Sequence, residues 1–155
     1  MTMQGRRSVL RMGFALALLP LAGPGLAQAY QLSEGEWRRK LSPAAYRVLR
    51  QAATEIPFSS SLDKEKGVGI FRCAGCGQPL FRSTAKFNSG TGWPSFTAAL
   101  PGAVDLRKEG GFLGRVEVRC ARCLGHLGHV FDDGPRPTGK RFCMNGVALR
   151  FQAAG

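Results

Sequence analysis

Two short stretches decide the fold of this chain: residues 73–76 read CAGC, and residues 120–123 read CARC. Two residues between cysteines let both thiolates of a pair reach one metal ion from a single turn, and two such turns complete a tetrahedron. Four thiolates leave no open coordination position, so the spacing predicts a structural zinc site rather than a catalytic one. Two disulfides or a redox-active CxxC pair are the alternatives. The expected zinc ligands are Cys73, Cys76, Cys120 and Cys123.

The first 29 residues are typical of a removable export signal rather than of folded structure. The run RRSVLR at 6–11 resembles a twin-arginine motif, an apolar stretch follows at 12–26, and residues 27–29 supply the small-x-small pattern for cleavage. An uncleaved membrane anchor is the alternative, but about fifteen residues broken by prolines are short for a bilayer. We therefore expect a periplasmic protein with no stable membrane anchoring. Twin-arginine export moves folded proteins, so zinc could be loaded in the cytoplasm.

Residues 30–155 are enough for one compact domain and too few for two. Loss of residues 1–29 lowers the basic residues from 22 to 19 against 10 acidic residues, which leaves a net charge of about +9. The basic residues are scattered, and the densest run, RRK at 38–40, favours a solvated helix face over a nucleic-acid patch. We expect a single domain that binds no nucleic acid.

Helix signals come first in the domain, and strand signals follow. Ser33 followed by Glu36 predicts a capping box, and Ser42 followed by Pro43 opens a second helix. After Pro57, glycine, proline and short alternating runs predict strands, which we expect within 70–72, 80–82, 111–120, 127–131 and 141–151. The sequence thus predicts a mainly β (α+β) fold, in which antiparallel sheets form a small barrel-like core flanked by N-terminal helices.

The fifth cysteine, Cys143, stands apart from both pairs in the run RFCMN at 141–145. Strand alternation places Arg141, Cys143 and Asn145 on one face. The arginine would favour the thiolate, and Asn145 can donate a hydrogen bond on the same side. A lone cysteine can also be a small buried hydrophobe, so this segment alone leaves both interpretations open.

The chain has two histidines, His126 and His129, in the run HLGHVF at 126–131. A regular strand would point them to opposite faces unless Gly128 permits an irregularity. We favour His129 as the partner of the thiol, because Asp133 follows closely and could orient its ring. Asp132 is the less favoured acid, and His126 could instead be a packed or zinc-adjacent histidine.

A glycine-lined loop, SGTGWPSF at 89–96, ends in two aromatic residues, Trp93 and Phe96. A tryptophan in such a turn can be a core residue. Beside a thiolate it could instead form an apolar wall for a small methyl-bearing group.

Together these motifs resemble the methionine sulfoxide reductase B family, which reduces the R epimer of methionine sulfoxide. The resemblance covers residues 41–151 and includes KFNSGTGWPSF at 86–96 and VRCARC at 118–123. It implies an antiparallel β fold, zinc on the four paired cysteines, and Cys143 as the nucleophile that becomes a sulfenic acid. Trp93, with Phe96 and Arg141, would bind the substrate. The groups implied around the reacting oxygen are His126, His129, Asp133 and Asn145.

Many members of that family carry a second, recycling cysteine near the tryptophan loop, but residues 89–92 contain none. The sulfenic acid would then be reduced by an external thiol, such as a thioredoxin-like or glutaredoxin-like partner. The expected substrate is oxidised methionine in proteins or peptides, and we expect a monomer.

Two other classes of protein remain as alternatives. A zinc-ribbon module could bind nucleic acid through phosphate contacts, but it gives the histidines and Cys143 no role. A peroxide-sensing thiol protein would use Cys143 but has no need of Trp93 or of Asp133.

Overall fold

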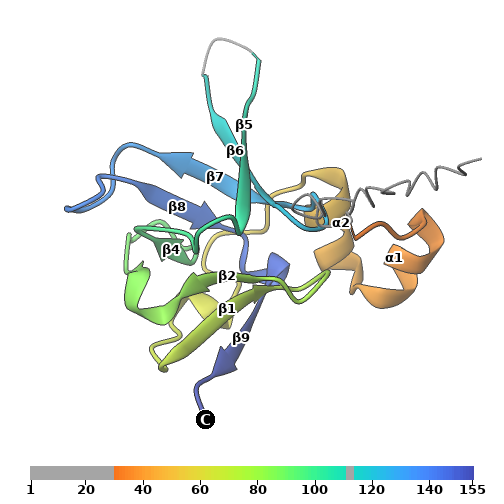
Figure 1. Cartoon of the computed structure of the whole chain (residues 1–155), viewed down its shortest axis with the longest axis horizontal. Helices are drawn as coiled ribbons and strands as arrows, with labels where there is room; N and C mark the ends of the chain where they lie inside the picture. Colours follow the sequence, from red (N-terminus) through yellow and green to blue (C-terminus); the bar gives the residue numbers. More distant parts are fainter. Residues whose placement is uncertain (1–29, 111–113) are drawn as a thin grey trace, which may run out of the picture.

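The computed structural model describes residues 30–110 and 114–155, so the expected export signal lies outside the described residues. Two helices come first, and strands with short 3-10 turns follow (Figure 1). No helix in the described part of the chain is long and apolar enough to span a bilayer. The helices are α1 (Glu34–Lys40) and α2 (Pro43–Gln51), and the strands are β1 (Gly69–Cys73), β2 (Pro79–Arg82), β3 (Lys86–Phe87), β4 (Ser95–Phe96), β5 (Val104–Lys108), β6 (Val116–Cys120), β7 (His126–Phe131), β8 (Arg141–Met144) and β9 (Leu149–Ala153).

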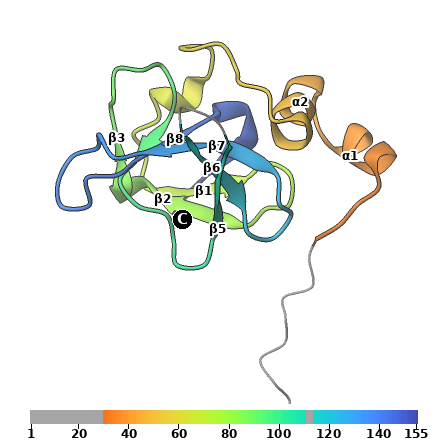
Figure 2. The ribbon, with the colours of Figure 1, turned by 90° about the horizontal axis from the view of Figure 1, so that it is seen from above.

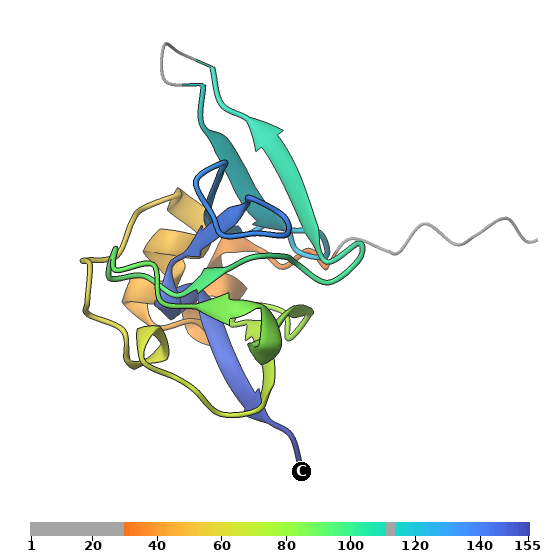
Figure 3. The same cartoon turned by 90° about the vertical axis from the view of Figure 1, so that its left-hand side faces the viewer.

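The strands form two antiparallel sheets. One has the order β2-β1-β9, and the other has the order β3-β4-β8-β7-β6-β5. In the larger sheet β5 and β6 extend beyond the rest of the domain as an arm (Figures 1 and 3). The mainly β fold with antiparallel sheets and two N-terminal helices, expected from the sequence, is confirmed.

Aromatic side chains fill the core of the domain. Phe96 is fully buried, stacks on Phe81 with ring centroids 4.3 Å apart, and meets Phe71 edge-on at 4.9 Å. Such contacts add to the gain from removing large apolar surfaces from water. Since β4 carries Phe96, this packing fixes the strand that follows the tryptophan loop.

Both predicted helix starts are confirmed. Ser33 and Glu36 form a reciprocal capping box, and the Ser42 hydroxyl accepts a hydrogen bond from the amide of Ala45. The two helices lie together at one side of the domain (Figure 2). A Cβ at Gly75 of the first cysteine turn would lie 3.2 Å from Trp37 and 3.6 Å from Leu49, so the helices pack closely over the four-cysteine cluster.

The sequence predicted a strand within 141–151, but this segment is not a single strand. It divides into β8, a 3-10 turn at Gly146–Ala148, and β9, which belongs to the other sheet. The cause is a carboxylate far away in the sequence: Glu55 accepts hydrogen bonds from the backbone amides of Gly146 and Val147. Those amides are therefore not available to a strand partner.

Candidate active site

One row of residues crosses the larger sheet and brings the candidate groups together. Cys143 on β8 is paired with His129 on β7 and with Ser95 on β4, and His129 is paired in turn with Glu117 on β6. Directly opposed residues of antiparallel strands project their side chains from the same face. The backbone pairing alone therefore places a thiol, an imidazole, a hydroxyl and a carboxylate side by side.

A β-bulge puts both histidines on that face. Glu117 is opposite His129, and Arg119 is opposite His126, so β7 has one residue more than β6 over this interval. The extra residue reverses the normal alternation, and the two imidazole rings lie 5.4 Å apart. The irregularity that the sequence left open at Gly128 is present: the φ of Gly128 is +156°, and a Cβ there would meet the Cys143 carbonyl oxygen at 2.1 Å.

A small open pocket of about 180 Å³ lies over this row. Of the residues expected at the site, Trp93, His129, Cys143 and Asn145 line it. Gly128 and Phe131 of the histidine motif also line it, and so do Thr54 and Arg115, which no sequence motif indicated. The pocket thus joins a thiol, an imidazole and two aromatic rings, which suits a small substrate group that carries one polar atom and an apolar remainder.

Burial controls the protonation of Cys143. It raises the pKa of the thiol above its ordinary value, while Thr91, Arg141 and Ser95 act in the opposite direction. The Thr91 hydroxyl lies 3.9 Å from the sulfur. The expectation that Arg141 favours the thiolate therefore has the correct sign, but burial has the larger effect, and the free thiol is mostly protonated near neutral pH.

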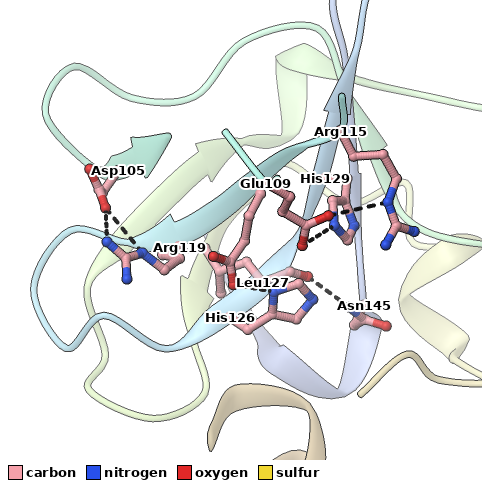
Figure 4. A network of polar contacts seen from close by, with 9 residues as sticks. Asp105, Glu109, Arg115, Arg119, His126, Leu127, His129 and Asn145 are labelled. Atoms are coloured by element: carbon pink, nitrogen blue, oxygen red, sulfur yellow. Dashed lines mark hydrogen bonds and ion pairs between the residues drawn. The ribbon is translucent and has the colours of Figure 1, made fainter. Parts of the chain in front are cut away.

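The partners of His129 differ from those expected. Glu109 lies 3.1 Å from its Nε2 and also pairs with Arg115, both from the β5–β6 arm (Figure 4). Asp133 instead receives two 2.8 Å hydrogen bonds from the Arg141 guanidinium. The expected orientation of His129 by Asp133 is therefore wrong, because a fully charged guanidinium is the stronger partner for that carboxylate.

His126 lies beneath the pocket rather than in its lining. Its side chain is 4% exposed, and its Nδ1 lies 2.8 Å from Glu117. Its Nε2 is buried without a hydrogen-bond partner among the described residues. Burial lowers the pKa of His126 although Glu117 opposes the shift, so the ring is neutral and donates from Nδ1.

Asn145 connects three segments around the pocket. Its Nδ2 donates to the Leu127 carbonyl at 3.0 Å, and its Oδ1 accepts from the amide of Glu55 at 2.9 Å. The Leu127 carbonyl also accepts from the Asn145 amide at 2.8 Å. Since Leu127 belongs to the bulge, Asn145 holds the irregular part of β7 beside Cys143.

Glu55 is the residue that sequence reasoning missed most clearly. Its carboxylate binds the amides of Gly146 and Val147, and its carbonyl accepts from Trp93 Nε1 at 3.2 Å. With the bond from its amide to Asn145, it links the tryptophan wall to the end of β8. No local motif marks an acid 88 residues before Cys143 in the sequence, and only its tertiary contacts reveal it.

Two expected substrate-binding residues do not line the pocket. Phe96 is fully buried in the core, so it supports the tryptophan loop and does not contact a bound molecule. Arg141 lies beside the pocket with its guanidinium 4.4 Å from the Phe131 ring centroid. It acts on the site through its charge and through Phe131.

The four paired cysteines meet in one cluster, with all four Sγ atoms within 4.8 Å of one another. Cys73 and Cys123 Sγ lie 3.7 Å apart, and Cys76 and Cys120 Sγ lie 3.5 Å apart. A disulfide would require about 2.05 Å. Zinc–sulfur bonds of about 2.3 Å in a tetrahedron place sulfurs about 3.8 Å apart. The cluster therefore fits a structural zinc ion and does not fit two disulfides.

Fold and site together define a class: a small β domain with a four-cysteine cluster of metal-site geometry and a separate thiol in a pocket. The sequence matches the SelR domain over residues 41–153. It is 52% identical to "Peptide methionine sulfoxide reductase MsrB" of Methanosarcina barkeri over 127 residues, which are 81% of this chain and 89% of that protein. It is 54% identical to the protein of the same name from Bradyrhizobium diazoefficiens over 77% of this chain and 88% of that protein. The chain belongs to the MsrB family of SelR-domain proteins.

The fold also has a partial likeness among solved structures. The Mis18 "Yippee-like" domain superposes with a TM-score of 0.47 at 19% identity and covers 57% of this chain and 98% of that chain. A likeness of this size supports no conclusion about the site.

Proposed function

We propose that this protein reduces the R epimer of methionine sulfoxide in peptides and proteins to methionine. The relatives' shared name supports the activity. The single structural observation that carries it is the direct cross-strand pairing of Cys143 with His129 beneath the Trp93 wall. The pocket offers a nucleophile for sulfur, a proton donor for oxygen, and an aromatic surface for the methyl group.

In the proposed reaction the Cys143 thiolate attacks the sulfoxide sulfur. As the S–O bond weakens, the oxygen gains negative charge, and His129 supplies a proton to it. In net terms one oxygen atom moves from the substrate to Cys143. The substrate sulfur is reduced by two electrons, and the thiol is oxidised by two electrons to a sulfenic acid. Glu109, on Nε2 of His129, would stabilise the charged ring before the proton leaves.

The sulfenic acid requires an external reductant. The other four cysteines of the sequence lie in the metal cluster, so none can reach Cys143 to form an internal disulfide. Two equivalents of thiol, from a thioredoxin-like or glutaredoxin-like partner, would restore Cys143 with release of water and formation of a disulfide. Trapping of a mixed disulfide between Cys143 and the partner would support this route, whereas a stable internal disulfide would contradict it.

Zinc is the metal we propose for the four-cysteine cluster. When bound it supplies structural cross-linking, because four thiolates leave no position for substrate. The cluster lies under the helices and outside the Cys143 pocket, so its role is to fix the ends of β1 and β6. Metal analysis of the purified protein tests this assignment: a single zinc ion is expected, and its absence from active protein would contradict it.

Export to the periplasm through the twin-arginine route is a separate proposal that rests on residues 1–29 alone. Replacement of Arg6 and Arg7 by lysine should retain the protein in the cytoplasm. Efficient export of active, zinc-loaded variant would contradict the idea that folding around zinc precedes export.

The decisive assay for the activity uses dithiothreitol with separated R and S peptide sulfoxides. We expect reduction of the R epimer and little reduction of the S epimer. A steep salt-dependent affinity for DNA without sulfoxide reduction would favour the zinc-ribbon alternative, and a sulfenic acid formed with peroxide but without turnover would favour the sensor.

A further inference from the structure

Two large apolar side chains project into solvent next to the Cys143 pocket. Ile56 is 76% exposed and Phe58 is 66% exposed, while Thr54, two residues earlier, lines the pocket itself. Single exposed apolar residues are common. A pair beside a proposed active site, on the same segment that forms the pocket wall, is a candidate contact surface. We refer to Ile56 and Phe58 together as the apolar rim.

The segment that carries the apolar rim is held firmly. Glu55 between Thr54 and Ile56 is bound through its carboxylate, its amide and its carbonyl, as described above. The Phe58 amide donates to the Gly92 carbonyl at 2.7 Å. A rigid segment loses little conformational freedom when another molecule binds to it, so an apolar rim in this position is suited to binding.

Phe58 has a backbone conformation that is unusual for phenylalanine. Its φ is +64°, in the left-handed region where glycine and asparagine are at ease and a bulky aromatic residue is a rare outlier. Local conformation therefore disfavours phenylalanine at this position. The ring is mostly exposed and lies against Gly92 rather than in the core, so packing gives little compensation. Strained residues of this kind concentrate at ligand-binding sites.

We propose that the apolar rim docks an apolar side chain of the peptide substrate, two to four residues from the methionine sulfoxide. This inference rests on the proposed function. Two residues of chain span at most about 7 Å, and four span at most about 14 Å. Ile56 and Phe58 are two and four residues from Thr54, so their Cα atoms lie within those distances of the pocket wall. Side chains two to four residues from a sulfoxide held over Cys143 have the same reach in an extended peptide.

The chemistry of the substrate supports this occupant. Oxidation makes an apolar methionine polar and disrupts the core around it. The exposed segment then carries apolar neighbours that were buried with the methionine. Beyond Phe58 a larger hollow of about 790 Å³, lined also by Gly90 and Lys86, leaves room for the peptide to continue.

The test compares a peptide substrate with a minimal one. The enzyme would be the variant Ile56→Ser/Phe58→Asn, with dithiothreitol as the reductant. The substrates would be a peptide R-sulfoxide with leucine three residues from the sulfoxide, the same peptide with serine there, and N-acetylmethionine R-sulfoxide amide. We expect kcat/KM for the leucine peptide to fall about tenfold, with little change for the other two substrates.

The matched control is Leu106→Ser. Leu106 is 51% exposed on β5, and it is paired with Val118, one row from Glu117, so it projects from the face opposite Cys143. The control should leave all three rates unchanged. Phe58→Asn alone should melt at the same or a higher temperature than the wild type, because asparagine tolerates the positive φ. A lower melting temperature would indicate a structural role for the ring and would overturn the proposal.

The remaining outcomes are distinct. If the double variant loses kcat/KM equally on all three substrates, or loses it on none, docking by the apolar rim is overturned. The proposed activity still stands in that case, provided that the wild type reduces the R-sulfoxides. A loss only when a thioredoxin-like protein replaces dithiothreitol would assign the apolar rim to the reductant and would also overturn it. Failure of the wild type on every sulfoxide would instead refute the proposed function, and the docking proposal with it.

Discussion

His129 and Cys143 are directly opposed on neighbouring antiparallel strands, β7 and β8. Side chains at such positions have Cβ atoms about 5 Å apart. The proposed nucleophile and the proposed proton donor are thus positioned by backbone hydrogen bonds within a sheet, not by a loop that must close. A substrate oxygen between them would lie near both groups at once.

Replacement of His129 by asparagine should slow the chemical step more than it weakens binding. Loss of a positioned proton donor costs about 100-fold or more in rate. We therefore expect kcat for the R-sulfoxide peptide to fall by that factor with KM changed only slightly, as measured by steady-state kinetics with dithiothreitol. An unchanged kcat in His129→Asn would remove the histidine from the mechanism.

Replacement of Cys143 by serine should abolish turnover and leave zinc bound.

The reactivity of Cys143 should rise with pH through the alkaline range. Burial raises the pKa of its thiol above the ordinary value of 9.0, so the thiolate fraction at neutral pH is small and increases as the pH approaches the raised pKa. Arg141 opposes the shift, so Arg141→Leu should move the midpoint to still higher pH. The rate of iodoacetamide alkylation, measured against pH for the wild type and for Arg141→Leu, gives the midpoint of each protein. A midpoint below 9 in the free enzyme would contradict the dominance of burial.

Replacement of Glu55 by glutamine should weaken both stability and activity. A glutamine side chain has one acceptor oxygen, so it can accept from only one of the Gly146 and Val147 amides. Its NH2 group would face the second amide, which would lose its acceptor. We expect the free energy of unfolding to fall by about 1–3 kcal/mol, and kcat/KM to fall severalfold because Trp93 and Asn145 lose their common support. Denaturant titration and steady-state kinetics are the measurements.

The control for Glu55 is Glu65→Gln. The Glu65 carboxylate accepts one hydrogen bond, from the amide of Gly67, at an exposed site. Its loss should change stability by less than about 0.5 kcal/mol. Equal effects of the two substitutions would show that Glu55 has no special role.

A cysteine at position 91 should convert the chain to internal recycling. The Thr91 hydroxyl lies 3.9 Å from Cys143 Sγ, within reach of a disulfide after a small side-chain rotation. After one equivalent of sulfoxide, Thr91→Cys should lose two titratable thiols, whereas Thr91→Ser should yield a sulfenic acid that a dimedone probe can trap. A trapped sulfenic acid in both variants would show that the two positions do not meet.

Much of the fold could be predicted because its determinants are local. The capping residues Ser33 and Ser42 and the spacing within each cysteine pair act over a few residues. The alternation of 116–120 likewise marks a strand by itself. The larger sheet was foreseen only in part: β3 and β4 are two residues long, and β5 is exposed over much of its length. Such strands have no continuous apolar pattern to detect.

The site could be predicted to the extent that its residues lie close together in the sequence. Cys143, His129 and Trp93 are in the pocket as expected. Proximity along the chain predicts Asp133 as the partner of His129, yet the structure pairs Asp133 with Arg141. Glu109 lies at the site because the β5–β6 arm carries it to His129. Glu55 lies there because the segment 52–58 passes beside Trp93 and Asn145. Sequence spacing contains no information on those contacts.

Turnover of an R-sulfoxide peptide by zinc-loaded protein before and after selective alkylation of Cys143 tests directly whether this thiol is the nucleophile. The four cluster sulfurs should be protected by the metal, so mass spectrometry should find one modified cysteine and an unchanged zinc content. This single modification should remove turnover completely. Continued reduction of the sulfoxide by protein alkylated only at Cys143 would contradict it.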